Sequence, residues 1–388
     1  MKISKTISAE PGGPTQSRRV NRRDGCRRSG ECGGDRRFYL FAGHRLLLAL
    51  LFFAWPLRAQ TNVTFLTREH TDFKILYMPG ATNQLTLVAR DEDRTLNLAS
   101  NEVILVCKSN AQLALPPGTP FGDGGQPFWI LPQSQNVNLL YLGVSAEGIP
   151  AGVFNGPLSV QLKSLDGPGY FMVWQATGPG QYNIRVNTRD GLSASDAFTP
   201  LIGSHEHFNW GFSSTGIYCA TFQVVGQRIG EATNITSPWT TFVFHVLPLP
   251  LATNFPTWQK QFWPPGFNPS ISGTNGNGDG DAFNNLHEYA FGLSPTNANS
   301  LTNAPRFSFV TTNGQTFGAL GFTRSLSARD LLFEPQVSGA LPGNWLALTN
   351  TFSVPPISNG LTERVTLRDF LPATNGAQRY FRLKTTLF

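Results

Sequence analysis

The chain has 388 residues, among them 39 Gly, 28 Pro and 30 Phe, and only 14% of its residues are charged. This length suffices for two or three domains, and the composition favours a turn-rich β protein over a helical one. Residues 1–59 hold 12 of the 30 Lys and Arg but only four of the 24 Asp and Glu, which leaves 18 basic and 20 acidic residues elsewhere. The formal charge of +6 therefore lies in the leader, and the balance excludes an extended nucleic-acid surface on the folded part.

Residues 1–59 are predicted to be a signal or leader region. The basic stretch RRFYLFAGHR precedes the apolar core LLLALLFFAWPL (46–57), and LRAQ predicts cleavage after Ala59. The core is shorter than the roughly 20 residues that span a bilayer. We therefore expect an exported protein with no transmembrane helix in its mature chain; a retained membrane anchor is the alternative.

Residues 60–248 are predicted to form an antiparallel β-sandwich, because short strand patterns alternate with strong turn signals and no long helical period intervenes. Cys107 and Cys219 lie in two of these strand patterns. In an oxidising compartment they could pair, and two buried free thiols are the alternative. The predicted strands are NQLTLVARD, NEVILVCK, GPLSVQLKSL, GYFMVWQAT, GQYNIRVNT, GIYCATFQVVGQ and WTTFVFHVLPL.

The stretch GSHEHFNWGF (203–212) carries candidate metal ligands. On a strand, Glu206, Phe208, Trp210 and Phe212 share one face, and the other face holds His205, His207 and Asn209. Two imidazoles at i and i+2 can bind one Zn²⁺ or another first-row transition metal if a further ligand comes from elsewhere. The alternative is a strand with two solvated histidines.

EHTDF (69–73) offers that further ligand, because His70 and Asp72 also share a strand face. A shared metal would require ring nitrogens about 3–4 Å apart, given metal–nitrogen bonds of about 2.0–2.1 Å. His245 lies between large apolar residues in FVFHV and is predicted to be a packed core histidine.

Residues 61–248 resemble the choice-of-anchor M domain, a relative of a surface-anchored repeat of bacterial proteins associated with ABC transporters. The matching pieces, in the family's order, include TREHTDFKILY, PFWILPQSQNVNLLYLGVSAEGIPAGVF and GSHEHFNWGFSSTGIYCATFQV. The resemblance implies a surface protein linked to an ABC transporter, with metal capture as its expected task. The chain departs from the family in showing no wall-sorting or transmembrane tail. The family's recurrent polar residues fall on His70, Asp72, Gln133, Gln135, Asn187, Asp190, His205, His207, Asn209 and Trp210.

A second candidate is a ligand cleft around FWILPQSQ. Trp129, Gln133 and Gln135 could line it with Trp174 and Asn209. The alternative, which we favour, is a strand followed by a turn whose glutamine amides bind the backbone.

Residues 249–270 are predicted to be a linker whose prolines break regular structure, while Trp258, Phe262 and Trp263 indicate that it packs on a neighbour. Residues 271–300 contain NGDGDAFNNLHE (277–288), which follows the EF-hand ligand order of positions 1, 3, 5, 7, 9 and 12. A short helix after it is expected to carry the last ligand. The predicted Ca²⁺ ligands are Asn277, Asp279, Asp281, the Phe283 carbonyl, Asn285 and Glu288.

This loop departs from the EF-hand pattern at two places. Asn277 replaces an Asp, and Ala282 stands where Gly is expected, which predicts a penalty of roughly 1 kcal/mol for left-handed backbone. Extracellular modules bind Ca²⁺ with a Kd of about 10⁻⁴–10⁻³ M, so a weakened loop can still fill. An Asn/Asp/Gly-rich turn without an ion is the alternative.

Residues 301–388 are predicted to form a small C-terminal β domain. Residues 257–388 resemble the dockerin- or thrombospondin-type-3-like calcium element of bacterial surface proteins, followed by a β domain with a Trp-containing strand and an aromatic-rich closing strand. GNWLALTN and QRYFRLKTT match that pair. The resemblance implies a spacer and display unit.

We expect a binding protein of the cell surface or envelope rather than an enzyme. GVSAEG is not a nucleophile elbow, because Glu147 replaces its second glycine, and no phosphate-binding loop or His-Glu-x-x-His motif is present. Metal-dependent hydrolysis at His70, His205 and His207 is the one enzymatic alternative. The rival to metal capture is a structural or adhesive display protein with calcium as its only ion.

Overall fold

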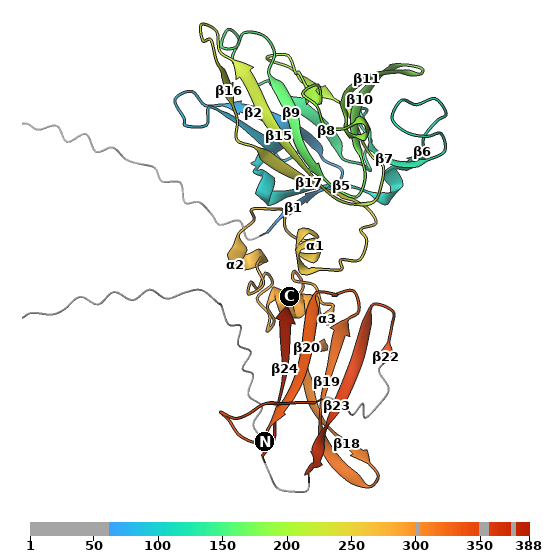
Figure 1. Cartoon of the computed structure of the whole chain (residues 1–388). Coiled ribbons are helices and arrows are strands. Elements are labelled where there is room, and N and C mark those ends of the chain that lie inside the picture. Colours follow the sequence, from blue (N-terminus) through green and yellow to red (C-terminus); the bar gives the residue numbers. More distant parts are fainter. Residues whose placement is uncertain (1–61, 299–302, 349–356, 374–377) are drawn as a thin grey trace, which may run out of the picture. The chain divides into compact units, whose positions relative to one another are not determined.

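A computed structural model of the chain describes residues 62–298, 303–348, 357–373 and 378–388 (Figure 1). The predicted leader, with Cys26 and Cys32, lies outside the described residues. The described residues are mainly β, as the sequence predicts. No helix in these ranges is long and apolar enough to cross a membrane.

One layer of the N-terminal sandwich is a seven-stranded sheet in the order β1-β5-β17-β15-β9-β12, with β16 paired to β15. A long turn-free run of apolar and β-branched residues forms its central strand β15, with the same bounds as the predicted strand. Its strands are β1 (Thr64–Leu66), β5 (Val103–Cys107), β9 (Ser159–Asp166), β12 (Ala197–Phe198), β15 (Gly216–Gln227), β16 (Asn234–Thr236) and β17 (Thr240–Val246).

Two five-stranded sheets form the facing layer (Figure 1). The first has the order β13-β8-β2-β3-β4, with β2 (His70–Tyr77), β3 (Leu85–Asp91), β4 (Leu96–Leu98), β8 (Tyr141–Ser145) and β13 (His205–His207). The second has the order β11-β10-β14-β7-β6, with β6 (Gln112–Ala114), β7 (Pro127–Leu131), β10 (Phe171–Gly178), β11 (Gln181–Asn187) and β14 (Asn209–Phe212). Short 3-10 turns span Ser100–Glu102, Ser109–Ala111 and Thr188–Asp190.

The core of the sandwich is aromatic and joins all three sheets. Phe73 of β2 stacks on Phe242 of β17 with ring centroids 4.2 Å apart, and it meets Trp210 of β14 edge-on at 5.3 Å. All three side chains are fully buried. Burial of each such ring contributes roughly 1.5–3 kcal/mol, so this contact fixes the position of β2 relative to the other sheets.

The sandwich is not wholly antiparallel, which corrects one detail of the sequence prediction. β5 pairs in parallel with both β1 and β17, and β2 pairs in parallel with β8. The apolar pattern of a strand predicts which face is buried and not the direction of its neighbour. Long connections, such as the one between β2 and β8, allow the parallel arrangement.

Cys107 and Cys219 are both free and buried. Cys107 packs in the core between the layers, whereas Cys219 packs with Ile104 and Val243 on the other face of the same sheet. The two thiols therefore point to opposite faces and do not form the disulfide that the sequence left open.

The segment predicted as an irregular linker contains helices. They are α1 (Phe255–Lys260) and α2 (Pro269–Ser272), and α3 (Asn285–Phe291) follows the calcium loop. Pro256 and Pro269 lie in the first turns, where the missing N–H has no helical partner to lose. Trp258 and Trp263 are buried in a cluster with Tyr289 of α3, as the expectation of packing requires.

The C-terminal β domain has two small sheets, ordered β18-β19-β23-β22 and β21-β20-β24. Their apolar faces enclose a core that includes Leu320, Val337 and Val365, and Phe291 of α3 packs into it. The strands are β18 (Arg306–Thr312), β19 (Gln315–Ser325), β20 (Leu331–Ser338), β21 (Leu346–Ala347), β22 (Ile357–Ser358), β23 (Thr362–Pro372) and β24 (Tyr380–Leu387).

Candidate metal centre

Three neighbouring strands bring the predicted histidines together. β8 lies between β2 and β13, and Gly143 of β8 pairs with Asp72 on one side and with His207 on the other. His70 pairs with Tyr141, and His205 pairs with Ser145, which lies two residues on from Gly143 in the same strand. Side chains two residues apart on a strand share a face, so all four predicted ligands lie on one face of this sheet.

The stretch that holds His205 and His207 turns from one sheet into the next. β13 ends at His207 and β14 begins at Asn209 in the neighbouring sheet. Phe208, Trp210 and Phe212 are buried, as the alternation predicts. The Trp210 indole donates a hydrogen bond of 2.9 Å to the Leu142 carbonyl of β8, which holds the central strand of the centre in place.

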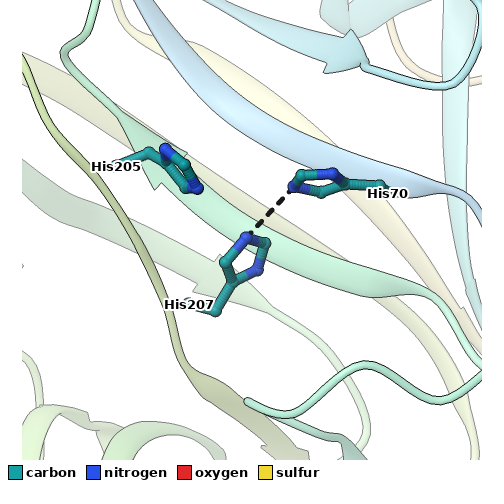
Figure 2. Close-up of side chains that lie close together, drawn as sticks. All are labelled: His70, His205 and His207. Carbon is teal, nitrogen blue, oxygen red and sulfur yellow. Dashed lines mark hydrogen bonds between the residues drawn. The ribbon is translucent and has the colours of Figure 1, made fainter.

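The ring nitrogens converge (Figure 2). Nε2 of His70 lies 3.1 Å from Nε2 of His207, within the separation that two ligands of one ion require. One ligand nitrogen from each of His70, His205 and His207 lies within 4.8 Å of the others. The His205 side chain is the most exposed of the three, at 40%, against 27% for His70 and 9% for His207.

Asp72 is buried beneath these rings and is 1% exposed. Its Oδ1 lies 3.9 Å from Nε2 of His70 and 3.8 Å from Nε2 of His207, and it has no hydrogen-bond partner. Burial raises the pKa of Asp72 to about 6, against the opposing effect of the nearby His70. A buried carboxylate oxygen without a partner is unfavourable unless a cation or a donor meets it.

His207 is held in the neutral form that binds metals. Burial, together with the neighbouring His70 and His205, lowers the pKa of His207 to about 4. Its ring stacks on Tyr141 with centroids 3.6 Å apart and an interplanar angle of 4°. The stack fixes the ring plane with Nε2 directed at His70 and Asp72.

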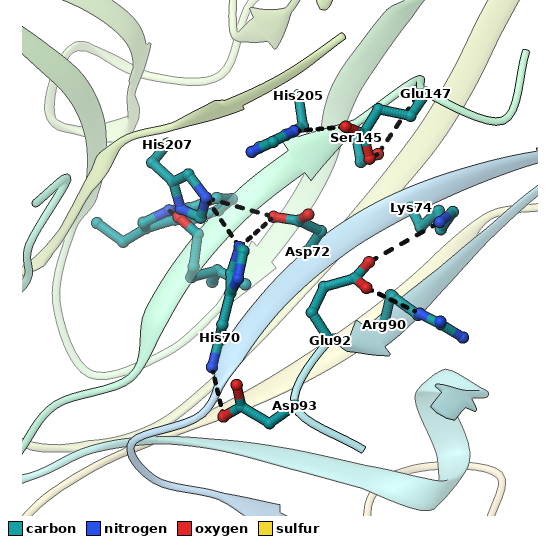
Figure 3. A network of polar contacts seen from close by, with 12 residues as sticks. His70, Asp72, Lys74, Arg90, Glu92, Asp93, Ser145, Glu147, His205 and His207 are labelled. Carbon is teal, nitrogen blue, oxygen red and sulfur yellow. Dashed lines mark hydrogen bonds and ion pairs between the residues drawn. The ribbon is translucent and has the colours of Figure 1, made fainter. Parts of the chain in front are cut away.

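His205 is oriented by a second carboxylate. Its Nδ1 lies 2.7 Å from Oε1 of Glu147, and the Ser145 hydroxyl donates to Oε2 of the same carboxylate at 3.4 Å (Figure 3). This hydrogen bond raises the pKa of His205 and lowers that of Glu147. A carboxylate on one ring nitrogen leaves the other as the ligand, which is the usual support for a metal-binding histidine.

Gly143 forms the floor of the centre. A Cβ at this position would lie 2.3 Å from Oδ1 of Asp72 and 2.9 Å from Cε1 of His207. Only glycine leaves room for the two side chains to approach across the middle strand. Gly143 and Tyr141 lie in β8, which has no alternating pattern that would indicate a site, and Glu147 lies two residues beyond its end.

The predicted calcium ligands form a second cluster. Asp279, Asp281 and Glu288 each place one carboxylate oxygen within 4.8 Å of the others. Glu288 has no exposed surface and both of its oxygens lack a hydrogen-bond partner. Burial, then Asp279 and Asp281, raise the pKa of Glu288 to about 8. α3 carries Glu288 into the loop, as predicted.

The two asparagines among the predicted calcium ligands both hydrogen-bond the backbone. Asn285 is fully buried; its Nδ2 donates to the Ile271 and Gly273 carbonyls, and its Oδ1 has no partner. Asn277 closes a turn, with Oδ1 accepting from Gly280 N at 2.8 Å. The left-handed residue of the loop is Gly280 (φ 74°), not Ala282, so the predicted backbone penalty at Ala282 does not arise.

The structure places the two tryptophans of the predicted ligand cleft in different clusters. Trp174 stacks on Phe121 at 4.2 Å in a separate buried cluster, and Trp129 lies in the main core. Gln133 hydrogen-bonds Asn209 and the Ala176 backbone, which matches the structural alternative. Gln135 is exposed.

Two further residues named from the sequence, His245 and Asn187, have structural roles. His245 is 3% exposed and donates from Nε2 to the Lys260 carbonyl at 3.0 Å, as expected of a packed histidine. Asn187 caps the turn Thr188–Asp190 by accepting from Arg189 N and donating to Asp190. Neither belongs to the metal centre.

No family model matches the chain, and no curated protein matches it significantly. The resemblance to the choice-of-anchor M domain therefore stays a prediction from the sequence.

Proposed function

We propose that the N-terminal sandwich binds a first-row transition metal, Zn²⁺ above all, through His70, His205, His207 and Asp72. The observation that carries this proposal is the buried Oδ1 of Asp72, which faces two Nε2 atoms and has no partner. A divalent cation at that point would satisfy the carboxylate and accept the ring lone pairs at once. Three imidazoles and one carboxylate suit zinc and its neighbours better than Ca²⁺ or Mg²⁺.

We infer a binding role rather than catalysis. Catalytic zinc commonly uses three protein ligands and leaves its fourth position to water, whereas structural and storage sites are closed by four protein ligands. Asp72 supplies the fourth ligand here. The alternative of metal-dependent hydrolysis would require Asp72 to stay outside the coordination shell.

We also propose a Ca²⁺ ion in the loop 277–288. The support is Glu288, because a fully buried carboxylate with two oxygens lacking partners needs a cation if it is to be ionised at neutral pH. The Phe283 side chain packs in the C-terminal core beside Phe291. Calcium bound in the loop would therefore also stabilise the C-terminal β domain.

Export, a place at the cell surface or envelope and supply of the metal to an ABC transporter complete the proposal. They rest on the leader and on the resemblance stated above. The rival function is that of a display or adhesion protein whose only ion is calcium.

Metal analysis of the full-length protein separates the two functions. After dialysis against calcium, bound metals are measured by mass spectrometry in the wild type, in a His205→Ala/His207→Ala variant and in a His245→Gln control outside the centre. Metal capture predicts one equivalent of a transition metal that the double variant loses and the control retains. Calcium alone in all three proteins would overturn metal capture and favour the display function.

A further inference from the structure

Carboxylates outnumber basic side chains around the metal centre (Figure 3). Glu92 and Asp93 lie in the turn after β3, where Asp93 accepts a hydrogen bond from His70 N at 3.2 Å. The network of polar contacts contains five carboxylates, of Asp72, Glu92, Asp93, Glu147 and Glu206. It contains two basic groups, of Lys74 and Arg90.

Each basic group in this network is engaged by a carboxylate, and so is Arg94, which lies in the turn after β3. Arg94 pairs with Glu69 at 3.0 Å and with Asp91 at 3.2 Å. Lys74 and Arg90 both pair with Glu92, at 3.8 and 3.3 Å. With neutral histidines, the network carries three negative charges more than positive ones.

The excess of carboxylates produces a negative potential at the centre. A divalent cation is attracted into such a field, and an anion is repelled by it.

Part of the ligand set is also shielded from solvent. The side chains of Asp72 and His207 are 2% and 9% exposed, whereas those of His70 and His205 are 27% and 40% exposed. Four protein ligands would displace most of the water or chelator bound to an arriving ion. A metal carried in an anionic complex would therefore have to give up its chelator to enter.

We propose that this centre takes up the free, hydrated divalent cation and excludes metal that is presented inside an anionic chelate. The inference rests on the proposed metal binding and narrows its ligand to one chemical class. A small molecule that carries its own metal is thereby set aside as the ligand.

Co²⁺ is the probe, because its visible absorption reports bound histidines directly. Stopped-flow absorption measures the association rate for the full-length wild type at low and high salt. A Glu92→Gln/Asp93→Asn variant removes two charges of the network and no proposed ligand. Asp123→Asn/Asp166→Asn is the matched control, because it removes two carboxylates whose partners, Arg189 and Lys260, lie outside the centre.

We expect the wild-type rate to fall about threefold or more as the Debye length shrinks from about 10 Å at 0.1 M to about 3 Å at 1 M salt. The Glu92→Gln/Asp93→Asn variant should start slower at low salt and depend less on salt, while the control follows the wild type. Equal rates and equal salt dependence in all three proteins would overturn the inference.

Native mass spectrometry tests whether the centre excludes a chelated metal. The protein is mixed with Zn²⁺ or with the anionic zinc complex of nitrilotriacetate, and the mass of the bound species is read. We expect zinc alone in both cases; a retained nitrilotriacetate would overturn the inference while leaving metal binding intact. Failure of the wild type to bind Co²⁺ or Zn²⁺ at all would instead overturn the proposed function.

Discussion

Nε2 of His70 lies 3.1 Å from Nε2 of His207, although 137 residues separate the two histidines in the chain. Without an ion, one ring must donate to the other, whereas with an ion both rings can direct lone pairs at the metal. The pair therefore joins the edge strand β13 to β2 across β8 in either state. Metal binding should strengthen that connection, since an ion bound only by the folded state stabilises it.

Replacing Asp72 by Asn tests the buried carboxylate. Its folded pKa of about 6 lies above the ordinary value of 3.8, so the ion-free protein loses stability as pH rises from about 4 to 6. We expect Asp72→Asn to remove this loss and to stabilise the ion-free protein at pH 7 by on the order of 2 kcal/mol. Thermal unfolding in chelator measures it; a variant less stable than the wild type at pH 7 would contradict the account.

The same variant should bind zinc more weakly. Loss of one of four ligands predicts an affinity lower by about 100-fold or more, measured by competition with a zinc indicator. The opposite changes in ion-free stability and in zinc affinity distinguish a ligand from a residue that merely holds the fold, for which both would fall together.

Glu147→Gln tests the orientation of His205. The amide keeps the size of the carboxylate but loses the charge that holds Nδ1 at 2.7 Å. We expect zinc affinity to fall by about 10–100-fold, as for other partners of metal-binding histidines, with little change in unfolding temperature because Glu147 is exposed. An affinity equal to that of the wild type would show that Glu147 has no part in the centre.

Gly143→Ala tests the floor of the centre. The added methyl group would collide with Asp72 and His207, so we expect loss of bound zinc and a lower unfolding temperature. Gly148→Ala is the matched control, because its Cβ would meet only Lys74 Cε at 4.0 Å. Zinc titration of both variants measures the loss of binding. Full zinc binding by Gly143→Ala would show that the centre does not need a glycine at this position.

The raised pKa of Glu288 predicts an unusual pH dependence of the protein's stability in the absence of calcium. Its folded pKa of about 8 lies above the ordinary 4.5, so stability should fall as pH rises from about 4.5 through 8. In chelator, the unfolding temperature of the wild type should fall relative to Glu288→Gln by on the order of 5 °C between pH 5 and 8. Added Ca²⁺ should restore it in the wild type only, and an identical pH profile for both proteins would exclude the calcium site.

Much of the fold could be predicted from local sequence patterns. The bounds of β15 coincide with the predicted strand, and the buried face of Trp210 and Phe212 follows from alternation alone. The helices α1 and α2 differ from the prediction because Pro256 and Pro269 occupy first turns, where a helix tolerates proline. Parallel pairing of β2 with β8 lies beyond any local pattern.

The sequence predicts the two pairs of metal ligands but not that the pairs meet. His205 and His207 share a face by period-two spacing, and so do His70 and Asp72. Their meeting depends on β8, since Gly143 sets the register of both neighbours. Long-range register is a tertiary property, so no local pattern indicates that Glu147 and Tyr141 belong to the centre or that Trp129 and Trp174 pack in different clusters.

Anomalous diffraction from crystals of the full-length protein grown with Zn²⁺ and Ca²⁺ tests the central claim most directly. The account predicts a zinc peak bonded at about 2.0–2.1 Å to Nε2 of His70 and His207, to the free ring nitrogen of His205 and to Oδ1 of Asp72. Zinc absent from this position, with the three rings separated and hydrated, would contradict it.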